Sequence, residues 1–106
     1  MSLIERAMNH FGVNGELILG GTHKVLPDFM LYDIQADGER YALCRADYMY
    51  NDDEVVNAIK QTLNVAKIVI VEPVDGRVVD KEAGNMSFAK IDTGDTMNTF
   101  ALAVIK

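Results

Sequence analysis

The chain is poor in several residue types, and each scarcity limits what the protein can be. It has 106 residues, of which one is cysteine, two are proline and none is tryptophan. A single cysteine excludes an intramolecular disulfide and suits a reducing compartment. No apolar run approaches the roughly 20 residues of a membrane-spanning helix, and the start "MSLIERAMNHFG" lacks the basic and apolar regions of a secretory signal. We therefore expect a cytoplasmic protein without a membrane segment.

Positive charge is also scarce. Ten Lys and Arg residues stand against sixteen Asp and Glu residues, which gives a formal net charge of −6, and no two basic residues are adjacent in the sequence. A negative surface repels nucleic acid phosphates, and binding them requires a local basic patch. The sequence therefore predicts no direct nucleic acid binding and favours a basic protein as the partner.

The remaining composition is that of a globular protein, with 49% apolar and 25% charged residues. Such proportions allow a packed core and argue against disorder. The length is common for one domain, and no linker rich in Pro or Ser divides the chain. We expect a single domain over residues 1–106.

Two segments carry the start signals of helices. Ser2 and Glu5 form a capping box ahead of an apolar face, and Asn51 and Glu54 form a second one. The second helix has a buried stripe at a spacing of four residues, made by Val55, Ile59 and Leu63. These patterns predict helices at about residues 3–11 and within residues 51–64.

Strand patterns fill most of the remaining chain. Alternating residues on both sides of Asp37-Gly38 predict a hairpin over residues 30–46. Short strands are expected at 16–19 and 25–26, separated by Gly20-Gly21, and further strands at 68–71, 77–79, 87–91 and 99–105. Unbroken apolar runs at 68–71 and 99–105 indicate strands that are covered on both faces. We expect an α+β fold, with two helices on one face of a mainly antiparallel or mixed sheet of about five to six strands.

The triplet Asp92-Thr93-Gly94 follows the apolar Ile91, as the catalytic triplet of aspartic proteases follows a strand. The resemblance to that family covers these four residues and nothing else. Only residues 93–106 follow Asp92, which leaves no room for the later strand and flap of a retroviral-type protease. We interpret the triplet as a polar turn between two strands.

The segment "GGTHK" is a candidate site for a small anionic ligand. Its two glycines leave their backbone amides accessible, and the three side chains that follow add hydrogen-bond donors. The candidate residues are Gly20, Gly21, Thr22, His23 and Lys24. In an enzyme with this site, His23 would act as general acid or base. No helix pattern follows the segment, although phosphate loops depend on one. A surface loop or bulge explains the same residues.

Other chemical sites find little support in the sequence. Cys44 could pair with His10 or His23 as a nucleophile, but it lies mid-strand, where a small buried thiol is the simpler interpretation. The spacing of one cysteine and two histidines gives no zinc motif. We expect no metal site, no cofactor and no catalytic residue.

The most acidic and aromatic stretch is "DYMYNDDE". It suggests a protein interface, because Tyr and Met are enriched at interfaces and acidic rims attract basic partners. The candidate interface residues are Tyr48, Met49, Tyr50, Asp52, Asp53 and Glu54. A loop leading into a capped helix explains the acidic residues equally well.

Together these observations favour a small acidic, non-catalytic binding or regulatory protein that acts through a protein interface. Two alternatives stay open: a ligand binder or enzyme with a site near Gly20–Lys24, and a structural component of a larger phage or mobile-element assembly. Homodimerisation also stays open, because the apolar strand at 99–105 could pair across a two-fold axis if it lay at a sheet edge.

Overall fold

The computed structural model describes residues 2–46, 50–73, 78–81, 89–92 and 97–106. Its elements are α1 (Leu3–His10), β1 (Ile18–Leu26), β2 (Phe29–Ala36), β3 (Glu39–Ala46), α2 (Asp52–Leu63), β4 (Ile68–Val71), β5 (Val78–Lys81), β6 (Ala89–Asp92) and β7 (Met97–Ile105). The α+β class is confirmed. In the part of the chain that is described, no helix is long and apolar enough to cross a membrane.

All described strands belong to one antiparallel sheet in the order β1-β2-β3-β7-β6-β5. The long strand β7 pairs with β3 along one edge, while β6 and β4 pair with successive parts of its other edge. The sheet therefore has seven described strands, more than the five to six expected, and none of their pairings is parallel. Each strand overlaps a predicted segment, and all of them join the same sheet, with β4 and β6 sharing one edge of β7.

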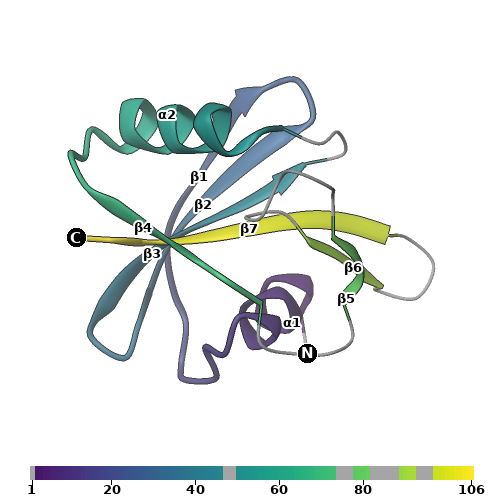
Figure 1. Cartoon of the computed structure of the whole chain (residues 1–106). Helices are drawn as coiled ribbons and strands as arrows, with labels where there is room; N and C mark the ends of the chain where they lie inside the picture. The colour runs from purple at the N-terminus through teal and green to yellow at the C-terminus, as the bar shows by residue number, and fades with distance from the viewer. Residues whose placement is uncertain (1, 47–49, 74–77, 82–88, 93–96) are drawn as a thin grey trace.

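The expected placement of both helices on one face is not confirmed, because they cover opposite faces (Figure 1). One buried cluster packs Val55 and Ile59 of α2 against Leu31, Cys44 and further residues of the sheet. The other packs Ala7 and Met8 of α1 and its C-cap residue Phe11 against sheet side chains that point the opposite way: Ile34, Leu43, Phe100 and Leu102. Successive side chains of a strand alternate between faces, and in β3 and β7 both sets are apolar, so each face needs its own cover.

Both predicted capping boxes are present. The hydroxyl of Ser2 accepts a hydrogen bond from the Glu5 amide at 3.2 Å, and the Asn51 side chain accepts one from the Glu54 amide at 2.8 Å. In return, each glutamate accepts a hydrogen bond from the backbone amide of its capping residue. Helix α2 ends at Asn64, which adopts the left-handed conformation (φ 53°).

The predicted hairpin is also confirmed. Its turn residues Asp37 and Gly38 both have positive φ, 52° and 79°, as a two-residue turn between twisted strands requires. Strands β6 and β7 pair with Asp92 opposite Met97, as the turn interpretation of the aspartate triplet expects. Thr93 and Gly94 of that triplet lie outside the described residues.

Two strand predictions need correction. The segment 18–26 is one strand, because it crosses Gly20 through a bulge and stays paired with β2. A Cβ atom at Gly20 would lie 3.2 Å from the Asp33 carbonyl oxygen, so glycine permits this close approach of two strands. Strand β4 is not covered on both faces, since Val69 is 50% exposed. The other three residues of its apolar run, Ile68, Ile70 and Val71, are half-buried.

Candidate functional site

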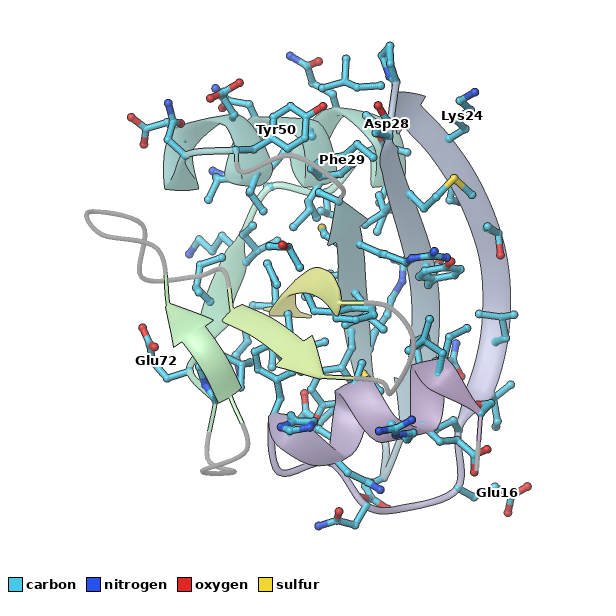
Figure 2. All side chains as sticks on the ribbon, turned by 90° about the vertical axis from the view of Figure 1, so that its right-hand side faces the viewer. Glu16, Lys24, Asp28, Phe29, Tyr50 and Glu72 are labelled. Atoms are coloured by element: carbon cyan, nitrogen blue, oxygen red, sulfur yellow. The ribbon has the colours of Figure 1, made fainter. Side chains whose placement is uncertain are left out.

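Strand β1 forms a border of the described sheet and carries several exposed apolar side chains. Among the residues whose side-chain burial is described, four large apolar side chains are exposed, and three belong to β1: Ile18 (58%), Leu19 (53%) and Leu26 (41%). In Figure 2 the strand runs along the right-hand side, with Glu16 just before its start and Lys24 near its end. Isolated exposed apolar residues are common, but three on one border strand mark a candidate contact surface.

Four surface hollows border this strand. Two lie at its start, one lined in part by Leu19 and the other by Ile18, with volumes of about 350 and 290 Å³. Two lie near its end, one beside Lys24 and one beside Val25 and Leu26, with volumes of about 240 and 330 Å³. Both ends of β1 are therefore flanked by concave surface.

The residues of the "GGTHK" segment do not converge on one site. Gly21 lies opposite Asp33 and His23 opposite Leu31, whereas Thr22 and Lys24 point to the other face of the sheet. The His23 ring folds back over Gly21, where an added Cβ atom would lie 3.4 Å from Nε2. Lys24 instead lines a hollow with Asp28, Met30 and Arg45. His23 and Lys24 therefore point to opposite faces of the sheet, and His23 does not line the hollow beside Lys24.

An ion pair lies on the His23 side of the sheet. The Arg40 guanidinium donates two hydrogen bonds to the Asp33 carboxylate, at 3.0 and 2.8 Å. These bonds are the main reason that the pKa of Asp33 is lowered from its ordinary value and that of Arg40 is raised. The arrangement ties β2 to β3 and keeps both groups charged, which suits a structural pair more than a proton-transfer site.

Cys44 is fully buried against α2, and burial raises the pKa of its thiol well above the ordinary value. His10 belongs to α1, on the opposite face of the sheet. An elevated pKa keeps the thiol protonated and unreactive. Within the described residues, no cluster of histidine, cysteine, aspartate or glutamate is suited to hold a metal ion.

The acidic and aromatic stretch before α2 is only partly described. The Tyr50 ring packs edge-on against Phe29 with centroids 4.9 Å apart, and its hydroxyl donates to the Pro27 carbonyl at 3.0 Å. Tyr50 therefore closes the edge of the core, and Glu54 belongs to the capping box. Asp53 is exposed on the helix. Tyr48, Met49 and the side chain of Asp52 lie outside the described part, so a common surface for these candidates is not established.

Comparison of the chain with protein-family models, curated proteins and solved structures finds no match in any of the three. The geometry around β1 is therefore the main indication of what the protein does. Sequence reasoning missed Ile18, Leu19 and Glu16 because a strand broken by two glycines was treated as two short fragments. The apolar pair immediately before Gly20 was the available signal.

Proposed function

We propose that this chain is a non-catalytic, protein-binding domain that receives an extended segment of another protein along β1. The observation that carries the proposal is the exposure of Ile18, Leu19 and Leu26 on a nine-residue border strand. An added strand gains backbone hydrogen bonds from the edge and side-chain contacts from the surfaces beside it. Bulges at Gly20 and Val25 leave Gly21–Lys24 as the regular part of the edge, so the docked segment would be short.

Charge favours a basic partner. The chain carries a net charge of −6, and the hollows at the start of β1 include four carboxylates: Glu5, Glu16, Asp37 and Glu39. An acidic surface speeds encounter with a basic segment and rejects an acidic one. A second copy of the same chain would bring the same negative charge, so a heterologous partner is favoured over a homodimer. The single buried cysteine fits a cytoplasmic setting.

The alternatives have less structural support. A ligand-binding or enzymatic role at Gly20–Lys24 would need His23 and Lys24 on one face, and they lie on opposite faces. A homodimer through residues 99–105 would need a free edge, whereas β7 pairs with neighbours on both sides. A role in a larger assembly would use the same exposed edge, with a subunit of that assembly as the partner.

Selection from a displayed library of random twelve-residue peptides tests the proposal. Peptides enriched on the wild-type protein should bind the Leu19→Lys variant at least tenfold more weakly, a loss of about 1.4 kcal/mol. This variant replaces an exposed apolar contact with a positive charge that repels a basic segment. Hydrogen exchange should show that the bound peptides protect amides of β1.

Val69→Lys is the matched control, since Val69 is 50% exposed on the short border strand β4. The enriched peptides should bind this variant as they bind the wild type. If they bind Leu19→Lys unchanged, if protection appears on β4 or α2 instead of β1, or if no peptide is enriched, the proposal is wrong.

A further inference from the structure

The two hollows at the start of β1 lie beside consecutive residues of the strand. The first, which we call the Glu5 hollow, is lined by Ser2, Ile4, Glu5, Gly15, Glu16, Leu17, Leu19 and Ile34. The second, the Glu39 hollow, is lined by Glu16, Ile18, Gln35, Ala36, Asp37, Gly38, Glu39 and Arg40. Ile18 and Leu19 point to opposite faces because side chains alternate along a strand, so the hollows flank the strand and share Glu16.

Each hollow combines apolar wall with negative charge. In the Glu5 hollow, Leu17 and Leu19 supply apolar surface next to the carboxylates of Glu5 and Glu16. Hydrogen bonds from Ser2, first from its backbone amide, lower the pKa of Glu5 and fix its carboxylate in the capping box. Long basic side chains suit such places, because their methylene groups cover apolar surface while the charged end meets the carboxylates.

The Glu39 hollow contains one cation, Arg40, but this group is already engaged with a carboxylate. Its guanidinium makes two hydrogen bonds to Asp33, which does not line the hollow. The positive charge of Arg40 is thus neutralised by Asp33, which lies outside the hollow. The negative charges of Glu16, Asp37 and Glu39 are therefore left to interact with a ligand. Both hollows are therefore complementary to a cation.

From this geometry we infer that the segment docking on β1 carries two consecutive basic residues, one side chain for each hollow. The inference rests on the proposed function and specifies the chemistry of its partner. To reach the hollows, the segment extends past the bulge at Gly20 and lies beside Ile18 and Leu19. There its successive side chains point to opposite faces, so adjacent basic residues reach both hollows. Basic residues separated by one position would point to the same face, and only one of them could reach a hollow.

Two peptides of identical composition and charge test the inference, acetyl-VTVTRRVTVT-amide and acetyl-VTVRTRVTVT-amide. The peptide with adjacent arginines should bind the wild-type protein about fivefold more tightly, the effect of roughly 1 kcal/mol at one exposed ion pair. Affinities are measured by fluorescence anisotropy at low ionic strength, because salt screens such contacts. Equal affinities would overturn the inference.

Two variants of the protein test whether the preference for adjacent arginines arises at these hollows. Glu16→Gln removes the carboxylate that both hollows share, so the ratio of the two affinities should fall at least by half. Asp53→Asn removes the same charge from the exposed surface of α2 and should leave the ratio unchanged. A ratio that survives Glu16→Gln, or one that falls with Asp53→Asn, contradicts the assignment to these hollows.

Hydrogen exchange separates this inference from the proposed function. If both peptides protect β1 equally and bind with equal affinity, strand addition stands and the requirement for adjacent basic residues is wrong. If neither peptide protects β1 and the displayed library also yields no β1 binder, both proposals are wrong.

Discussion

Strands β1 and β7 have the same length, nine residues, and opposite roles. Strand β7 is paired along both edges, and its middle residues, Phe100 to Ala103, are buried under helices on both faces. Strand β1 is paired along one edge, is interrupted by two bulges and exposes Ile18, Leu19 and Leu26. The difference separates the part of the sheet that holds the fold together from the part where we propose that a partner binds.

Position in the sheet decides these roles more than composition does. Both strands contain several apolar residues, "ILGGTHKVL" in β1 and "MNTFALAVI" in β7. The apolar residues of β7 meet α1 on one face and α2 on the other. Those at the start of β1 are covered by neither helix and stay more than half exposed, so the free energy of burying them is still available to a partner.

The largest expected effect comes from making the same substitution in both strands. Leu102 of β7 is fully buried, whereas Leu19 of β1 is 53% exposed. Leu102→Ala should lower the free energy of unfolding by about 2–5 kcal/mol, because it removes buried methyl groups and leaves a cavity. Leu19→Ala should change it by no more than about 0.5 kcal/mol, as is usual at exposed positions. Urea unfolding measures both, and similar losses would contradict the division between the strands.

A smaller effect is expected from the cap of α2, which covers one face of β7. Asn51→Ala removes the side chain that accepts the Glu54 amide hydrogen bond and should cost about 1 kcal/mol of folding free energy. Peptide affinity at β1 should be unchanged, since the cap is remote from the hollows at the start of that strand. Asn57→Ala makes the same exchange at an exposed position inside α2 and should not destabilise the protein. An equal loss in both variants would show that the cap is unimportant.

Local signals were sufficient to predict the helices and the tight hairpin. The pairs Ser2 with Glu5 and Asn51 with Glu54 act within one helical turn, and Asp37-Gly38 fixes its turn through its own backbone conformation. The unbroken apolar run in residues 99–105 also indicated an interior strand correctly. For the helices and the hairpin, the sequence neighbourhood contains all the groups that determine the conformation, whereas the interior place of β7 also depends on its pairing with distant strands.

Longer-range features could not be predicted in the same way. The strand continues through Gly20 because the Asp33 carbonyl of the neighbouring strand approaches it closely, a contact between residues distant in the sequence. The placement of α1 and α2 on opposite faces depends on which alternate side chains of β3 and β7 each helix covers. The hollows join α1, the segment before β1 and the hairpin turn, so no single motif contains them.

The smallest expected effect concerns the ion pair between Asp33 and Arg40, which links β2 to β3 in the region between the two compared strands. Asp33→Asn should lower the free energy of unfolding near neutral pH by about 0.5–1 kcal/mol, because solvent around the partly exposed Arg40 weakens the pair. The Asp33 pKa is lowered in the folded protein from its ordinary value of 3.8. The stabilisation is thus complete above that value and is lost as the pH falls through the folded pKa.

Urea unfolding at a series of pH values from neutral to strongly acidic tests this prediction. The difference between wild type and Asp33→Asn should shrink in acid and disappear once the wild-type carboxylate is protonated. Asp53→Asn, an exchange at an exposed position of α2, serves as the reference for removing one negative charge. If Asp33→Asn and Asp53→Asn gave the same pH profile, the bond between Asp33 and Arg40 would add nothing beyond net charge. A loss of stability confined to Asp33→Asn would instead show that this ion pair holds β2 to β3. Strand β2 is the neighbour of β1, the proposed docking strand.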